Sequence, residues 1–179
     1  FAFAVERFGK VDGLVNNAAT NPHFGPFVDV SWPAWDKTFE VNVKGYFHAA
    51  RTLVTHLQSR KAPGSIVNVS SVLGLRGGRM QGVYAMTKAA VISMTRTLAI
   101  ELGPDNIRVN AIAPGFIETR FSSAITENDA LKQMILQKTP LQRIGVPDNI
   151  APLVTHLLSD AAGFTTGSTF VADGGLLAE

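Results

Sequence analysis

The sequence predicts an α/β domain built on a doubly wound parallel sheet. Apolar runs of strand length alternate along the chain with longer stretches of helical periodicity, which is typical of parallel sheets joined by right-handed connections. The runs are apolar at nearly every position, as expected of strands that are buried on both faces. Polar residues follow these runs directly, at the edge of the sheet where such folds bind ligands.

The first half of the chain predicts two helices and a strand. Residues 1–9 have the pattern of a short amphipathic helix, and residues 13–18 form an apolar run that asparagines close. A loop rich in Pro and Gly covers residues 21–26. Ser31, followed by a proline in the first turn, predicts the start of a long helix that continues to about Ser59.

The second half continues the alternation. It predicts a strand over 65–70, a helix from Tyr84 to about Leu102, a strand over 108–113, a helix over 147–158 and a final strand over 169–172. Residues 116–140 form a longer and more polar insert, which we interpret as a substrate lid; a plain surface excursion is the alternative. The apolar residues of the insert are spaced as a short amphipathic helix: Phe121, Ile125, Leu131, Met134 and Ile135.

The composition fits a single globular domain over residues 1–179, with 46% hydrophobic and 17% charged residues. The net charge is +2 and the basic residues are scattered, so nucleic acid is not an expected partner. The apolar stretches are too short to span a membrane, and the first residues lack a basic leader, so neither a membrane anchor nor a signal peptide is expected.

The sequence lacks the residues that several other kinds of active site require. Cysteine is absent, which excludes disulfides and thiolate metal sites and suits a reducing, cytoplasmic compartment. The four histidines have no ligand spacing, so no metal site is expected. The Gly-x-Ser-x-Gly motif of a serine hydrolase is also absent.

Tyr84 and Lys88 are four residues apart on a predicted helix, so they lie on one face, one turn apart. We expect the ammonium group to lower the pKa of Tyr84 from its usual value of about 10. A tyrosine tuned in this way can act as a general acid or base near neutral pH. Ser71 directly follows the strand predicted over 65–70, so its hydroxyl and the phenol of Tyr84 are expected to meet at the mouth of the sheet.

The pattern Ser-x12-Tyr-x3-Lys, formed by Ser71, Tyr84 and Lys88, resembles the catalytic set of the short-chain dehydrogenase/reductase family. Further motifs of that family occur in its order and at its spacing over essentially the whole chain. They are Asn16-Asn17-Ala18-Ala19, Asn42-Val43-Lys44-Gly45, Asn110-Ala111-Ile112-Ala113-Pro114-Gly115 and Asp173-Gly174-Gly175. The resemblance implies a Rossmann-like fold and hydride transfer between NAD or NADP and a small carbonyl or secondary alcohol.

The resemblance also implies a role for each site residue. Tyr84 is the general acid or base, Ser71 donates a hydrogen bond to the substrate oxygen, and Lys88 lowers the pKa of Tyr84 and binds the nicotinamide ribose. Asn42 fixes a water that links Lys88 to solvent. The implied cofactor contacts are Asn16, Ala18, Tyr84, Lys88, Pro114, Gly115, Ile117 and Thr119.

The family opens with a strand and a glycine-rich turn, Thr-Gly-x3-Gly-x-Gly, which holds the pyrophosphate of the cofactor. The chain has no such motif, so we expect it to be the C-terminal part of the fold, with the first strands and about 70 residues missing. Two functions of different classes follow: an oxidoreductase, or a catalytically silent fragment that acts only as a folded or oligomeric module. A narrower alternative is a 3-oxoacyl-carrier-protein reductase.

The helices predicted over 36–59 and 84–102 carry apolar residues on more than one face. One face of a sheet cannot cover all of that surface. We therefore expect a homo-oligomer, a dimer or tetramer, and the resemblance implies that these two helices form the interface.

Overall fold

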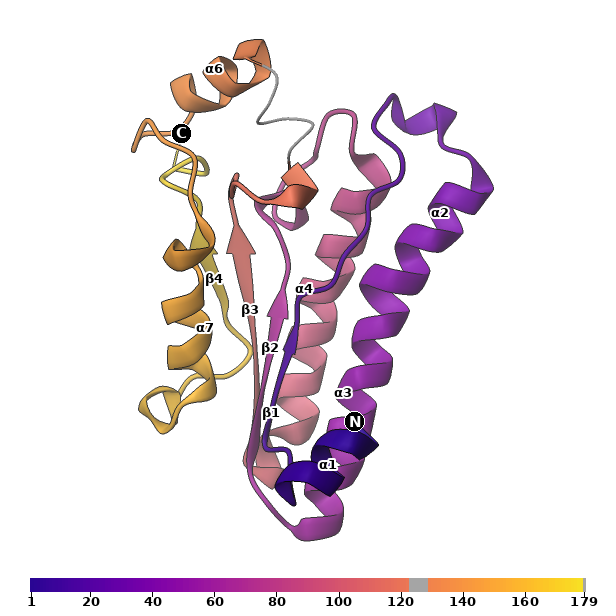
Figure 1. Ribbon diagram of the computed structural model, residues 1–179, viewed down its shortest axis with the longest axis vertical. Helices are drawn as coiled ribbons and strands as arrows, with labels where there is room; N and C mark the ends of the chain where they lie inside the picture. The colour runs from indigo at the N-terminus through magenta and orange to yellow at the C-terminus, as the bar shows by residue number, and fades with distance from the viewer. Residues whose placement is uncertain (123–128, 179) are drawn as a thin grey trace.

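Parallel strands run side by side through the middle of the molecule and end at a common edge (Figure 1). The computed structural model describes residues 1–122 and 129–178. Within that part, the sheet has four strands in the order β1-β2-β3-β4. Their bounds are β1 Gly13–Asn16, β2 Gly64–Val69, β3 Ile107–Pro114 and β4 Thr169–Ala172. The predicted parallel α/β sheet is confirmed, and each predicted strand is present.

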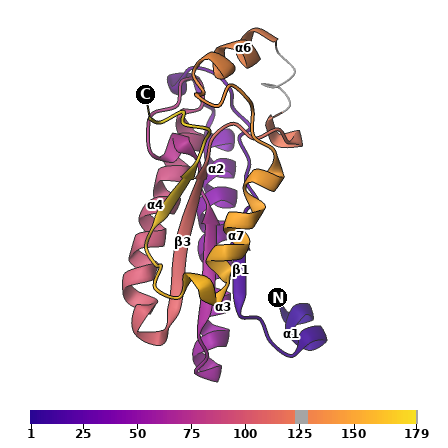
Figure 2. The ribbon, with the colours of Figure 1, turned by 90° about the vertical axis from the view of Figure 1, so that its left-hand side faces the viewer.

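Helices cover both faces of this sheet (Figures 1 and 2). Their bounds are α1 Ala2–Phe8, α2 Trp32–Phe39, α3 Gly45–Arg60, α4 Gly82–Leu102, α6 Asp129–Gln137 and α7 Ala151–Leu158. Neighbouring residues of β2 show the division between the faces. Ile66 packs into a core with Leu53 and Leu57 of α3, whereas Val67 packs into a second core with Leu157 of α7. Successive strand residues point to opposite faces, so α3 and α7 lie on opposite sides of the sheet.

The last connection of the sheet differs in hand from the first two. Each of the three steps between parallel strands moves in the same direction across the sheet. The helices α3 and α4 belong to the first two steps and lie on one face, whereas α7 belongs to the third step and lies on the other (Figure 2). The expectation of right-handed connections throughout is therefore wrong for the step from β3 to β4.

The long helix predicted from Ser31 to Ser59 is present, but a π-helical turn over Glu40–Lys44 divides it into α2 and α3. Ser31 caps α2 as predicted, because its hydroxyl accepts a hydrogen bond from the backbone N–H of Ala34 at 3.4 Å. Asn42 lies in the π-helical turn and is fully buried. Turns of this kind inside α-helices are frequent at functional sites.

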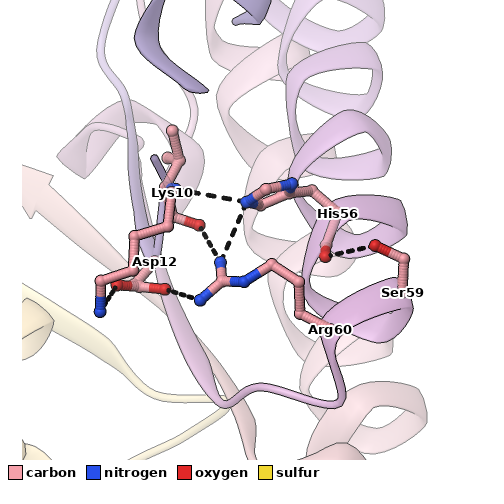
Figure 3. A network of polar contacts seen from close by, with 6 residues as sticks. Lys10, Asp12, His56, Ser59 and Arg60 are labelled. Atoms are coloured by element: carbon pink, nitrogen blue, oxygen red, sulfur yellow. Dashed lines mark hydrogen bonds and ion pairs between the residues drawn. The ribbon is translucent and has the colours of Figure 1, made fainter. Parts of the chain in front are cut away.

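A cluster of polar side chains ties the segment before β1 to the end of α3 (Figure 3). Asp12 forms ion pairs with Lys10 at 2.8 Å and with Arg60 at 2.9 Å. The Nε2 atom of His56 accepts hydrogen bonds from the backbone N–H of Val11 at 3.3 Å and from Arg60 at 2.9 Å. Hydrogen bonds from Lys10 and then Arg60 hold the pKa of Asp12 below its usual value. The cluster fixes the start of β1 against α3, at the opposite end of the sheet from the site described below.

The insert over residues 116–140 contains α6, which confirms a short amphipathic helix for the part of the predicted pattern from Leu131 to Ile135. Ile135 is buried on this helix and Met134 is exposed. Phe121, which belongs to the same predicted pattern, lies instead in a 3-10 turn over Arg120–Ser122. Ile125, which belongs to the same predicted pattern, lies outside the described residues. The lid role of this segment stays a prediction. Over residues 1–122 and 129–178, none of the helices combines the length and apolar character needed to cross a membrane.

Candidate active site

A cavity of about 920 Å³ opens where the strands β1, β2 and β3 end. The residues that follow each strand line it, including Ala18 after β1, Ser71 after β2 and Gly115 after β3. Tyr84 and Lys88 of α4 complete the lining. The carboxyl ends of parallel strands meet at one edge of a sheet, and this edge is the usual ligand site of such folds.

The loop after β2 is fastened to α4, which positions Ser71 near Tyr84. The hydroxyl of Ser70 donates a hydrogen bond to the backbone carbonyl of Lys88 at 2.8 Å. Gly74 packs so closely that an added Cβ would lie 2.7 Å from the same carbonyl, so a larger residue there would separate the two elements. Ser71 accepts a hydrogen bond from the N–H of Leu73 at 3.1 Å, and this bond sets the orientation of its hydroxyl.

Lys88 is almost fully buried, with 1% of its surface exposed. Its Nζ atom donates to the carbonyl of Val69, at the end of β2, at 2.7 Å. The same atom lies 3.4 Å from the hydroxyl of Tyr46, which itself donates to Val69 at 3.2 Å. Nζ also lies 5.2 Å from the ring centroid of Tyr46 and 5.6 Å from that of Tyr84. The ammonium group is thus held between two aromatic rings, in contact with two oxygen atoms.

Burial controls the titration of both groups. It raises the pKa of Tyr84 to about 12, and the side chain of Ser71 opposes this shift. Burial also lowers the pKa of Lys88 to about 8. The expected lowering of the Tyr84 pKa by Lys88 is therefore wrong for this structure. The spacing of four residues does bring the groups together, but loss of solvent disfavours the phenolate more strongly than its neighbours stabilise it.

Asn42 contacts α4 through Thr87 but is not part of the cavity lining. Its amide donates to the carbonyl of Thr20 and to the hydroxyl of Thr87, both at 3.0 Å, and accepts from the N–H of Thr20 at 2.8 Å. The hydroxyl of Thr87 donates in turn to the backbone carbonyl of Tyr84 at 2.8 Å. Asn42 therefore links the segment after β1 to the turn of α4 that carries the tyrosine.

Asn16 is also set back from the cavity. Its amide donates to the carbonyl of Tyr46 at 3.3 Å and to the side chain of Asn68 at 2.9 Å. Asn68 donates in turn to Thr95 of α4 at 2.9 Å. This buried chain braces the sheet against its helices, while the adjacent Asn17 and Ala18 line the cavity.

Four of the residues expected to contact the cofactor lie along one segment of the lining: Pro114, Gly115, Ile117 and Thr119. Gly115 packs against Asp173, where an added Cβ would lie 2.8 Å from the Asp173 backbone. Ile117 forms a parallel bridge with Gly145, and the N–H of Thr119 donates to the hydroxyl of Ser122 at 3.0 Å. These contacts fix the course of the segment along the wall.

The geometry adds residues that the sequence analysis did not assign to the site. Tyr46 contacts Lys88 directly, and the ring of Phe121 lies 5.8 Å from that of Tyr84. Asn21 and Gln81 form a hydrogen-bonded pair in the cavity lining. Only the spacing of Tyr46, four residues after Asn42, could have indicated an inward position on the same helix.

A family model described as enoyl-(acyl carrier protein) reductase matches residues 1–177. Dehydrogenase/reductase SDR family member 4 from Oryctolagus cuniculus is 40% identical over 174 residues, which cover 97% of this chain and 66% of that protein. The chain belongs to the short-chain dehydrogenase/reductase family. Another family member, the 3-oxoacyl-(acyl-carrier-protein) reductase of Thermotoga maritima, is 41% identical over 97% of this chain and 69% of its own length.

Solved members of the short-chain dehydrogenase/reductase family have the same fold. A gluconate 5-dehydrogenase from Burkholderia cenocepacia, in complex with NADP and tartrate, matches with a TM-score of 0.95 at 30% identity, over 99% of this chain and 69% of that one. A 4-hydroxyisoleucine dehydrogenase complexed with NADH matches with a TM-score of 0.93 at 34% identity, over 99% and 73%. These two solved relatives are complexed with NADP and with NADH.

The chain is shorter than these family members. It spans 66% of the SDR family member 4 protein from Oryctolagus cuniculus and 62% of that from Homo sapiens. The part of this chain that matches these relatives contains Ser71, Tyr84 and Lys88. Within the described residues, His, Asp and Glu side chains nowhere gather in groups of three that could hold a metal ion.

Proposed function

We propose that the protein is an NAD- or NADP-dependent oxidoreductase that interconverts a small carbonyl compound and the corresponding secondary alcohol. The observation that carries this proposal is the convergence of Ser71, Tyr84 and Lys88 on one cavity at the ends of the parallel strands. Relatives that are dehydrogenases or reductases, and solved relatives in complex with NADP or NADH, support the same reaction class.

The cavity suits a nicotinamide cofactor. Its volume of about 920 Å³ and its largely apolar wall match the sites of large organic ligands. Lys88 would hold the ribose, while the segment from Pro114 to Thr119, together with Ala18, would hold the rest of the nicotinamide half. The cofactor, when bound, supplies or accepts the hydride. The residues favour neither NAD nor NADP.

Side chains of the protein would transfer the proton that accompanies the hydride. During reduction Tyr84 would donate its phenolic proton to the carbonyl oxygen, and during oxidation it would take the alcohol proton. A pKa of about 12 means that the phenol carries its proton at neutral pH, as a proton donor must. Ser71 would donate a hydrogen bond to the same oxygen and stabilise the charge that develops there. The buried Lys88 would stabilise the phenolate that remains after proton transfer.

The test is Tyr84→Phe in the protein at its natural length, compared with Tyr46→Phe. Tyr84 and Tyr46 are the two tyrosines of these 179 residues, and the two variants remove the same atom at two places. We expect Tyr84→Phe to lower kcat by about 10²–10⁴-fold with cofactor affinity nearly unchanged, because the ring that lines the cavity stays and only the hydroxyl assigned to proton transfer is lost. Tyr46→Phe keeps Tyr84 as the proton donor, so its kcat should fall far less. Turnover by Tyr84→Phe within about tenfold of wild type would contradict the assignment.

A 3-oxoacyl-carrier-protein reductase is the narrower candidate. The relative from Thermotoga maritima, at 41% identity, favours it. Turnover of a carrier-bound 3-oxoacyl thioester at a kcat/KM far above that of small ketones would support this narrower function. A catalytically silent module is the remaining alternative, and it predicts no turnover of any carbonyl compound.

We also propose that the protein is a homo-oligomer, a dimer or a homotetramer. Phe47 on α3, together with Met86 and Ile100 on α4, exposes large apolar side chains on the helices expected to form the interface. Light scattering that gives a monomeric mass at micromolar concentration would contradict this proposal. The cytoplasmic location stays a prediction.

A further inference from the structure

A pair of side-chain amides lies in the wall of the cavity that holds Tyr84. The Nδ2 atom of Asn21 donates to the Oε1 atom of Gln81 at 3.2 Å, although the residues are 60 positions apart. Gln81 immediately precedes α4, three residues before the catalytic tyrosine, and Asn21 belongs to the segment after β1. Both line the cavity together with Ser71 and Tyr84, and both are half-buried.

This pair has hydrogen-bonding capacity to spare. A primary amide offers two N–H donors and one carbonyl acceptor, and one bond joins these two amides. With the bond as found, the NH₂ group of Gln81 and the carbonyl of Asn21 have no partner among the described residues. Turning both amides over exchanges these roles but leaves the same set, one NH₂ group and one carbonyl. The pair thus presents a donor and an acceptor next to each other.

Beyond this pair and the hydroxyl and amide side chains near the strand ends, most of the cavity wall is apolar. Phe24, Leu73 and Phe121 line the same cavity, and Lys88 is the only charged side chain among the described residues that line it. Lys88 is almost fully buried, donates to the carbonyl of Val69 and is assigned above to the nicotinamide ribose, so it is not available to a substrate carboxylate. A carboxylate would therefore meet no free cation here, and it could only accept hydrogen bonds. A hydrocarbon group would leave the amide donor and acceptor unpaired, which is costly once water is displaced.

A hydroxyl group matches this site because it accepts and donates at once. We propose that Asn21 and Gln81 form a hydroxyl-binding subsite, which selects an uncharged hydroxy ketone or polyol as the substrate. This inference rests on the proposed oxidoreductase function and specifies its substrate class. The subsite would hold a hydroxyl close to the reacting carbon, since Gln81 and Tyr84 occupy the same end of α4.

The experiment compares substrates that differ in one group, with the protein at its natural length and each dinucleotide in turn. The substrates are 2-butanone, 1-hydroxy-2-butanone, 4-hydroxy-2-butanone and 3-oxobutanoate. The readout is the ratio of kcat/KM for each hydroxy ketone to that for 2-butanone, so a general loss of activity cancels. We expect at least one hydroxy ketone to be preferred by about tenfold or more, because a site built for a hydroxyl rejects the analogue that lacks it.

The variants Gln81→Met and Asn21→Leu should bring this ratio close to one. The control variant Leu73→Met changes the apolar wall of the same cavity at nearly constant volume and should keep the ratio. A wild-type ratio near one, a preference for 3-oxobutanoate, or a preference that survives in both variants would overturn the subsite.

Absence of turnover with every carbonyl compound would instead refute the proposed function. The subsite would then be judged by binding, from a calorimetric titration with 1,2-butanediol and with 2-butanol. Tighter binding of the diol that is lost in Gln81→Met would support it, and equal or undetectable binding would overturn it.

Discussion

Lys88 is a cation with almost no exposed surface, and its position depends on Tyr46 as well as on the backbone. The hydroxyl of Tyr46 lies 3.4 Å from Nζ, and both groups share the carbonyl of Val69. An oxygen atom at that distance stabilises the ammonium form. We therefore expect Tyr46 to be a positioning residue, which would act on the proposed reaction through Lys88.

Tyr46→Phe should move the alkaline limb of the pH–rate profile to lower pH. Activity that needs the ammonium form falls as the pH rises through the pKa of Lys88, which is about 8. Loss of the Tyr46 oxygen disfavours the ammonium and lowers that pKa further, so activity is lost earlier on the alkaline side. The measurement is kcat/KM against pH for wild type and variant. A purely structural role would lower stability and leave the profile in place.

The π-helical turn between α2 and α3 carries a side chain that joins several segments behind the cavity. Its Asn42 holds both backbone groups of Thr20 and the hydroxyl of Thr87, and thereby connects three segments behind the cavity. A regular α-helix through these residues would shift the register of the side chains that follow, including Tyr46. The turn thus sets the inward direction of two polar side chains.

Asn42→Ala should destabilise the protein by roughly 2–4 kcal/mol, because it leaves several buried polar groups without partners. The free energy of unfolding in urea measures this change. Asn149→Ala is the matched control, since Asn149 is exposed and its Oδ1 atom accepts from Val146 and Arg143 at 3.0 and 2.9 Å. The control should cost about 1 kcal/mol or less. Equal losses of unfolding free energy in the two variants would show that the hydrogen bonds of Asn42 contribute no more to stability than those of an exposed asparagine.

Sequence patterns could predict most elements because each is encoded locally. The strand expected over 108–113 is Ile107–Pro114, and the helix expected from Tyr84 begins at Gly82. The π-helical turn could not be predicted, because it is stabilised by Thr20 and Thr87, which are distant in sequence. The direction of the Tyr84 pKa shift was missed for a similar reason. Spacing indicates which groups meet, but solvent loss depends on the whole fold.

Candidate site residues were predictable to different degrees. Ser71, Tyr84 and Lys88 line one cavity, because Ser71 follows the end of a strand and the other two residues lie on one face of the next helix. Both positions can be inferred from the sequence. Asn16 and Asn42 turn away from that cavity, and their motifs gave no indication of the direction. The Asn21–Gln81 pair joins two loops, so no local period could have indicated it.

At the scale of the whole molecule, β1 is an edge strand of the described sheet, with Val15 partly exposed. Unpaired edges of this kind promote association with other chains. We expect a polypeptide of these 179 residues alone to aggregate and to bind neither NAD nor NADP measurably. Calorimetric titration with both dinucleotides, beside light scattering, tests this expectation. A polypeptide extended at its N-terminus by about 70 residues with a glycine-rich turn is the control, and micromolar binding by the 179-residue polypeptide would contradict the expectation.

The hydrogen bonds that support the site join residues far apart along the chain. Asn42 meets residues 22 and 45 positions away, and Asn16 meets Asn68 at a separation of 52. Contacts of this range form late, because long loops must close before such contacts stabilise anything. During refolding, helical circular dichroism should therefore return well before Tyr84 is enclosed by its partners. The rate at which the phenol of Tyr84 becomes buried should therefore report the rate of the last step of folding.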